Sequence, residues 1–113
     1  MKGEYSIGVV IPAKNEERFI QKVVETLPDF VDVAIVVNDG STDRTLSLVE
    51  NMDSLVELHC ISLNGEGVGA AIDAGHRFLM DRWPDTQFIS VVMAGDGQMN
   101  PDDMERLLEP VVQ

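Results

Sequence analysis

The chain has 113 residues, of which 44% are hydrophobic and 25% are charged. This balance argues against disorder and fits one globular domain with a buried core, so we expect residues 1–113 to form a single domain. Its 20 acidic and 8 basic residues give a net charge of −12, a surface that repels phosphate backbones and argues against nucleic acid as a partner.

We expect residues 1–113 to carry neither a secretory signal nor a membrane span. The first apolar run, residues 7–11, is short and is followed by Pro12, which is typical of a strand. No run approaches the roughly 18 apolar residues of a membrane helix. Cys60 is the single cysteine, so an intrachain disulfide is ruled out and a cytoplasmic location is expected. A longer parent protein would act at the cytoplasmic face of the membrane.

Short β-branched runs alternate with segments of helical period along the chain. The runs predict strands at residues 5–11, 33–37, 55–61 and 88–93. Apolar residues at helical spacing predict helices over residues 20–27, 68–79 and 104–111, with a shorter helix over residues 43–51. Such alternation predicts an α/β fold, Rossmann-like and doubly wound, with a mostly parallel sheet covered on both faces.

A polar or glycine-rich turn follows each predicted strand, at residues 12–17, 38–43, 64–69 and 94–98. Ligands of open parallel sheets bind beyond the carboxyl ends of the strands. We therefore expect the four turns to converge on one edge of the sheet and to form the site.

Asp39 ends the second strand and precedes Gly40 and two hydroxyl residues. Its carboxylate can accept a hydrogen bond from a base or a ribose, although an Asx turn followed by a helix cap explains the same residues. The third turn carries Gly65, Gly67 and Gly69 at the start of a helix, where amides can approach a phosphate. Tight packing of the helix on the sheet is the equally weighted alternative.

Asp96 lies between two glycines after the fourth strand, a setting that suits a divalent ion bridging two phosphates. An ordinary turn aspartate is the alternative. The acidic chain favours Mg²⁺ or Mn²⁺ as the counter-charge for a diphosphate. Lys14 is either a further phosphate contact or a solvated side chain, and we favour the contact. His59 and His76 have no ligand partner at metal spacing and are interpreted as packing residues.

Four segments together resemble family 2 glycosyltransferases, with the closest likeness to the dolichol-phosphate-mannose-synthase-like and polyprenyl-glycosyltransferase branch. They are residues 10–17 (VIPAKNEE), residues 37–45 (VNDGSTDRT), the glycine turn with Ala70, Ala71 and Gly75, and residues 94–101 (AGDGQMNP). The resemblance implies a GT-A fold in which Pro12, Asn15 and Glu16 line a nucleoside pocket, Asp39 reads the base and Asp96 binds the metal. The expected donor-binding set is Pro12, Ala13, Asn15, Glu16, Asp39, Gly40, Ser41, Gly67, Gly69 and Asp96.

Two departures from the family pattern affect this interpretation. Ala94 stands where the family often has a first acidic residue, which leaves Asp96 as the single metal ligand of that motif. Family members carry the acceptor site and the general base in a second half, which would lie beyond Gln113. We therefore expect an N-terminal, truncated GT-A domain that is inactive alone and contains no catalytic base.

The expected function is transfer of a hexose from a UDP- or GDP-linked sugar to a lipid phosphate, such as polyprenyl phosphate, or to a glycan, with this chain as the donor-binding half. A non-catalytic nucleotide-sugar-binding or regulatory module is the alternative. A phosphoacceptor receiver domain is disfavoured because no aspartate ends the third strand, residues 61–64. An uncovered sheet edge would allow homo-oligomers.

Overall fold

The computed structural model describes residues 5–93, which form a sheet of four parallel strands. The strands are β1 (Ser6–Ala13), β2 (Val33–Asp39), β3 (Glu57–Leu63) and β4 (Phe88–Val92), in the spatial order β3-β2-β1-β4. The helices are α1 (Ile20–Glu25), α2 (Thr45–Glu50) and α3 (Val68–Arg82). The helix expected over residues 104–111 and the turn at residues 94–98 lie outside the described part.

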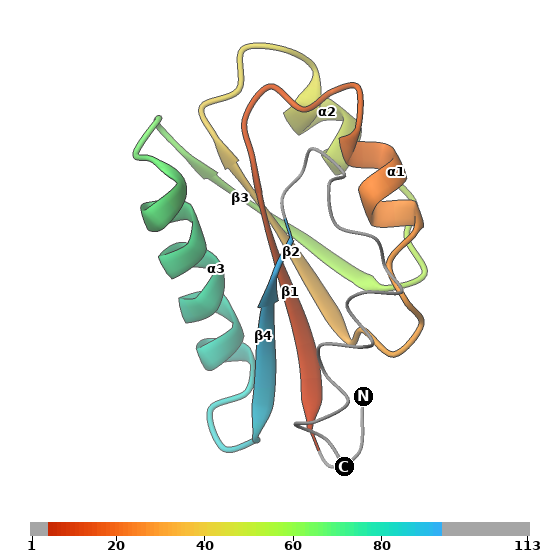
Figure 1. The fold of residues 1–113 in the computed structure, drawn as a ribbon, viewed down its shortest axis with the longest axis vertical. Coiled ribbons are helices and arrows are strands. Elements are labelled where there is room, and N and C mark those ends of the chain that lie inside the picture. The colour runs from red at the N-terminus through yellow and green to blue at the C-terminus, as the bar shows by residue number, and fades with distance from the viewer. Residues whose placement is uncertain (1–4, 94–113) are drawn as a thin grey trace.

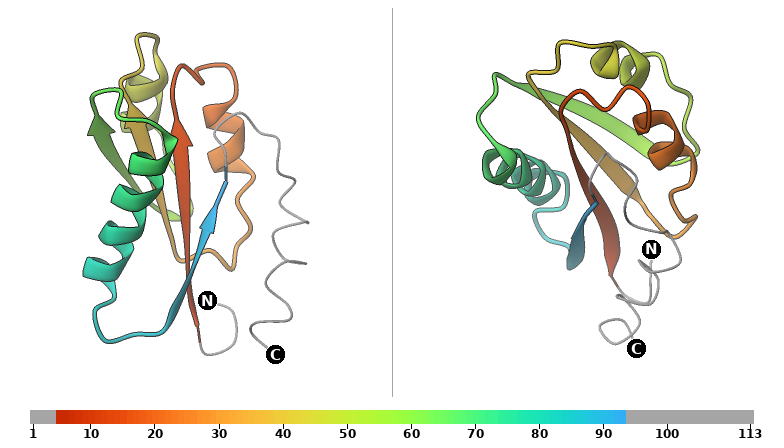
Figure 2. Two further views of the ribbon diagram at one scale, coloured as in Figure 1. Left: turned by 60° about the vertical axis from the view of Figure 1, so that its left-hand side comes forward. Right: turned by 45° about the horizontal axis from the view of Figure 1, so that its top comes forward.

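Helices cover both faces of this sheet. The long helix α3 packs on one face, and α1 and α2 pack on the other (Figures 1 and 2). β1 and β2 lie in the middle, and nearly every residue of both is buried, because β-branched and other apolar side chains point to the two helical layers. The predicted Rossmann-like, doubly wound α/β fold of the GT-A type is thus confirmed for residues 5–93.

The observed elements follow the sequence pattern closely, with differences at their ends. β1 and β2 each run two residues further than their apolar runs, to Ala13 and Asp39, because the parallel ladder continues into the polar turn. β3 begins two residues later than expected, at Glu57, which leaves Leu55 fully exposed. α1 ends at Glu25, before the apolar residue Leu27.

Two glycines allow α3 to approach β1 closely. Gly75 of α3 lies directly over Val10 of β1, where a Cβ atom would overlap the valine side chain. Gly8 of β1 lies against Leu79 of α3, and a Cβ there would come within 2.5 Å of the leucine Cδ1. This contact fixes α3, and with it the turn that precedes the helix, relative to the centre of the sheet.

Candidate functional site

Three loops emerge side by side at the carboxyl edge of the sheet. The register pairs Ala13 of β1 with Asn38 of β2, and Asp39 of β2 with Leu63 of β3, so the three strands end at nearly the same level. The β1–α1, β2–α2 and β3–α3 loops therefore meet there, at the upper end of the view in Figure 1. The convergence expected from the sequence holds for these three turns.

Asp39 is the buried carboxylate at this edge, with 6% of its surface exposed. Its Oδ1 accepts the backbone N–H of Glu66 at 2.7 Å, and its Oδ2 accepts that of Gly67 at 2.8 Å. The Glu66 bond is the main reason that the pKa of Asp39 lies below its ordinary value; it outweighs the opposing effect of burial, with help from Gly67, Gly65 and the charge of Lys14. Asp39 is therefore anionic at neutral pH.

The side chain that bonds to the backbone of the turn after β2 belongs to Asn38, whereas the carboxylate of Asp39 bonds to the β3–α3 turn. Asn38 accepts the backbone N–H of Ser41 through Oδ1 at 3.3 Å. The carboxylate of Asp39 is bonded to the β3–α3 turn, so this residue links the β2–α2 loop to the β3–α3 loop.

The glycines of the site adopt backbone conformations that other residues rarely adopt. Gly40, Gly65 and Gly67 have φ angles of +77°, +72° and +100°. Gly40 also lies against the next loop, since a Cβ atom there would be 3.0 Å from the backbone nitrogen of Gly65. These glycines shape the turns, and the N–H of Gly67 is directed at Asp39.

The β1–α1 and β2–α2 loops are joined by hydrogen bonds that we call the loop interlock. Asn15, at φ +55°, donates its N–H to Ser41 Oγ at 3.0 Å and accepts the Thr42 N–H on Oδ1 at 2.8 Å. The N–H of Glu16 donates to Thr45 Oγ1 at 2.8 Å. Asn15, Glu16 and Ser41, all expected in the donor site, thus contact the neighbouring loop.

Asp43 extends the interlock to the start of α2. Its Oδ1 accepts the Thr45 N–H at 2.9 Å, and its Oδ2 accepts the Glu17 N–H at 3.2 Å. Burial raises the pKa of Asp43, but these bonds and the Thr45 hydroxyl outweigh burial and leave the pKa below its ordinary value. Asp43 and Thr45 are absent from the expected donor-binding set, although the segment at residues 37–45 that resembles the family includes both.

A pocket of about 300 Å³ opens between the three loops, and its walls are Pro12, Ala13, Lys14, Asp39, Gly65, Gly67 and Val68. Four residues of the expected donor set line it: Pro12, Ala13, Asp39 and Gly67. Gly69 lies in the first turn of α3 and is exposed. Asp96 lies outside the described residues. Lys14 lines the pocket, as does Val68, which sequence reasoning missed.

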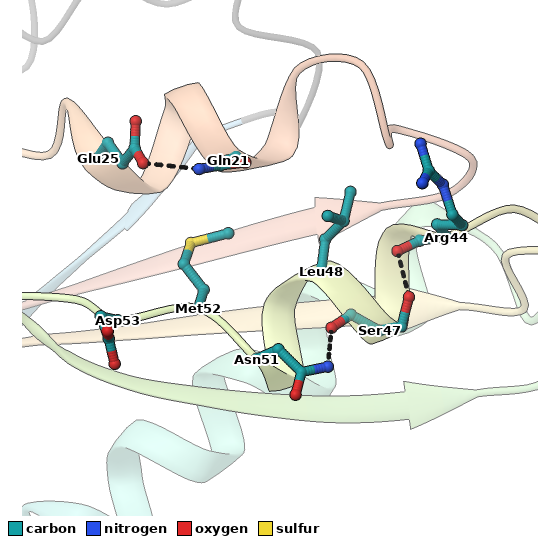
Figure 3. A pocket seen from close by; sticks show the side chains of 8 residues that line it. All are labelled: Gln21, Glu25, Arg44, Ser47, Leu48, Asn51, Met52 and Asp53. Carbon is teal, nitrogen blue, oxygen red and sulfur yellow. Dashed lines mark hydrogen bonds between the residues drawn. The ribbon is translucent and has the colours of Figure 1, made fainter.

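A larger hollow of about 490 Å³ lies between α1 and α2, with Arg44 at the end of the β2–α2 loop among its lining residues. Figure 3 shows Leu48 and Met52 pointing across it toward α1. Hydrogen bonds from Gln21 to Glu25 and from Asn51 to the Ser47 carbonyl stay within one helical segment, whereas Arg44 Nε donates to Glu17 Oε2 of the β1–α1 loop at 3.0 Å. None of the expected site residues lines this hollow. We therefore take the smaller loop pocket as the candidate site because of the residues that line it.

The described residues alone do not form a metal centre. Among residues 5–93, no three His, Cys, Asp or Glu side chains are grouped as metal ligands. The expected ligand, Asp96, falls in the part that the structure does not describe. No helix within this described range is long and apolar enough to cross a membrane.

Comparison with known proteins adds to this geometry. Residues 8–113 match the family model of glycosyl transferase family 2, a range that includes all three loops. The chain belongs to glycosyl transferase family 2. The expectation drawn from the four sequence segments is thereby confirmed at the level of the family.

The curated relatives that the chain matches are longer proteins. The chain is 30% identical to the UDP-N-acetylglucosamine–dolichyl-phosphate N-acetylglucosaminyltransferase of Methanococcus voltae, with 94% of this chain and 47% of that protein covered. It is 31% identical to the uncharacterized protein MJ1222 of Methanocaldococcus jannaschii, covering 94% of this chain and 42% of that protein. It is 32% identical to MJ0544 of the same organism, with coverages of 88% and 44%.

The chain thus spans less than half the length of the curated relatives it matches. No solved structure matches it significantly.

Proposed function

We propose that this family 2 chain forms the donor-binding half of a glycosyltransferase that moves a hexosyl group from a nucleotide diphospho-sugar to a polyprenyl phosphate. The observation that carries the proposal is the ionised, buried carboxylate of Asp39 in a pocket at the carboxyl edge of a parallel sheet. The printed activity of the Methanococcus voltae relative supports the acceptor class.

UDP is the donor nucleotide that we favour. The relative uses a UDP-linked sugar according to its name. Pro12 and Ala13, which line the same pocket as the glycine turn, would flank the nucleoside.

A divalent cation, Mg²⁺ or Mn²⁺, would neutralise the diphosphate. Two amides of the glycine turn already donate to Asp39, and Lys14 is the single cationic side chain among the residues that line the pocket, so the described residues offer the diphosphate little positive charge. Asp96 is the carboxylate that we propose as the metal ligand, with the metal stabilising the charge of the leaving diphosphate.

This chain would bind the donor without transferring the sugar. Its relatives are more than twice as long as the segment that it matches, and we propose that the general base and the acceptor cleft belong to residues that correspond to their remaining length. Binding without turnover is also the property of the alternative, a nucleotide-sugar-binding module, so turnover by a longer parent protein separates the two.

Calorimetric titration of the 113-residue chain with UDP and with GDP, each with and without Mn²⁺, tests the proposal. We expect binding of UDP that Mn²⁺ strengthens and that Asp39→Ala abolishes. Asp53→Ala, which removes an exposed carboxylate outside the pocket, serves as the control and should bind UDP normally. No binding of either nucleotide at millimolar concentration would refute the proposal.

A further inference from the structure

Two adjacent backbone amides of the β3–α3 turn point at one carboxylate. The amides of Glu66 and Gly67 precede α3, and paired amides at the start of a helix form a nest that commonly binds a phosphate or another anion. In this chain the anion in the nest is the side chain of Asp39, held at 2.7 Å and 2.8 Å.

We propose that Asp39 is a positioning residue, whose carboxylate fills the amide nest of the β3–α3 turn and holds that turn as a wall of the nucleotide pocket. The diphosphate is then bound without the amides of Glu66 and Gly67. The inference concerns the pocket of the proposed function and rests on that function for its ligand, while the role of Asp39 in shaping the turn can be tested in the free chain.

The packing of α3 on β1 and the contact with Gly40 fix the two ends of the environment of this turn, but few side chains within the turn itself can hold its backbone conformation. Gly65 and Gly67 have no side chains, and a Cβ atom added to either would meet no atom within 4 Å. Both have φ angles in the left-handed region. Because glycine adopts many backbone conformations, the turn can change its conformation if its contacts are lost. Hydrogen bonds to an ionised acceptor are roughly twice as strong as neutral ones, so Asp39 is well suited to fix such a turn.

The same geometry limits what Asp39 can do for a ligand. Both of its oxygens are engaged by the turn, and the side chain is 6% exposed, so a narrow part of it faces the pocket. The first bond within α3 runs from the Ala71 N–H to the Gly67 carbonyl at 3.1 Å. Because the Glu66 and Gly67 amides already donate to Asp39, a phosphate at the start of α3 would have to use the amides that follow Gly67.

Asp39→Asn is the informative variant because it preserves the shape of the side chain. In either orientation its NH₂ group faces one of the two backbone donors, so one amide of the nest loses its acceptor. Asp53→Asn makes the same change of charge at an exposed carboxylate outside the pocket and is the matched control. Amide spectra and hydrogen exchange of the free chain report on the turn, and titration with UDP and CDP reports on the pocket.

A positioning role gives a distinct pattern in these measurements. In Asp39→Asn the Glu66 and Gly67 amide protons move upfield and exchange about tenfold faster or more, while Asp53→Asn leaves them unchanged. The affinities for UDP and CDP fall by the same factor, because the wall is lost for both nucleotides. If Asp39 served only to read the base, the turn amides would stay protected and the preference for UDP over CDP would collapse.

Protected amides in Asp39→Asn, or altered amides with unchanged UDP affinity, would overturn the proposal. If the wild-type chain binds no UDP, the proposed function fails, whereas the amide measurements still decide whether Asp39 holds the turn. Should Asp39→Asn not fold, scalar coupling through the hydrogen bond, between the Glu66 or Gly67 amide nitrogen and the Asp39 carboxyl carbon, tests the nest in the wild-type chain; absence of both couplings would also overturn it.

Discussion

Asn15 and Thr42, 27 residues apart in the chain, are held together by the Asn15 Oδ1, which accepts both the backbone N–H and the hydroxyl of Thr42 at 2.8 Å and 3.3 Å. Asn15 sits at φ +55°, a left-handed conformation in which asparagine is among the better-tolerated residues after glycine. The residue thus meets two demands at once: a positive φ and an acceptor directed at the next loop.

Replacing Asn15 separates these two demands. Asn15→Ala removes the side-chain acceptor of the Thr42 hydrogen bonds. It also places alanine at a positive φ, which is strained for a residue with a Cβ atom. We therefore expect the free energy of unfolding to fall by about 1–3 kcal/mol. Asn15→Gly loses the acceptor but tolerates the backbone conformation, so it should be less destabilised than Asn15→Ala. Urea unfolding of both variants measures the difference, and equal stability of the two would show that the backbone conformation contributes nothing.

Gly75 in α3 should tolerate no side chain. Gly75→Ala forces a methyl group into Val10, and overpacking of this kind costs roughly 1–3 kcal/mol, which exceeds the gain in helix propensity. Gly69 lies in the same helix with nothing within 4 Å of an added Cβ, so Gly69→Ala should be neutral or stabilising. Thermal unfolding of the two variants provides the comparison; a stable Gly75→Ala would contradict the close approach of α3 and β1.

Glu57 on β3 should give the chain a stability that depends on pH. Hydrogen bonds from Arg82 and His59 lower its pKa from 4.5 to about 2. Because the pKa is lower in the folded chain, the carboxylate stabilises the fold above pH 4.5 and this contribution is lost as the pH falls from about 4.5 to about 2. Both side chains of the Arg82 pair are partly exposed, so the effect is modest and decreases with salt.

Urea unfolding at pH 6, 4 and 3 measures this dependence. Glu57→Gln should reduce the loss of stability between pH 4.5 and 3, whereas Glu50→Gln, at an exposed position on α2, is the control for a simple change of net charge. An identical pH dependence in the wild type and in Glu57→Gln would show that the Arg82 contact does not stabilise the fold.

Metal removal should weaken donor binding if Asp96 has its proposed role. We expect EDTA to reduce the affinity of the wild-type chain for UDP by about tenfold or more, because two phosphate charges then meet a chain of net charge −12 without a counter-ion. Asp96→Asn should bind UDP as weakly with Mn²⁺ as the wild type does with EDTA. Uridine carries no phosphate, so its affinity should be the same for the wild type and Asp96→Asn, with Mn²⁺ or with EDTA. An effect of the metal on uridine binding would show that the ion does not act through the diphosphate.

Local patterns were sufficient to predict most of the fold. β-branched runs marked all four strands within two residues at either end, and the placement of Asp39 after β2 pointed to the carboxyl edge as the candidate site. The contacts between loops could not be predicted, because Asn15 with Thr42 and Asp39 with Glu66 join residues that are 27 positions apart. A single sequence indicates where polar residues gather, but their choice between a neighbouring loop and a ligand depends on distances that appear only once the chain is folded.

The contact between α3 and β1 consists of two size-matched pairs, in which each element contributes one glycine and one larger residue: Gly8 with Leu79, and Gly75 with Val10. A larger residue at either glycine requires a smaller one directly opposite. Substitutions at this contact are therefore expected in pairs: homologues that lack one of the glycines should carry a smaller side chain at the position that faces it. An engineer who redesigns this helix must change strand and helix together.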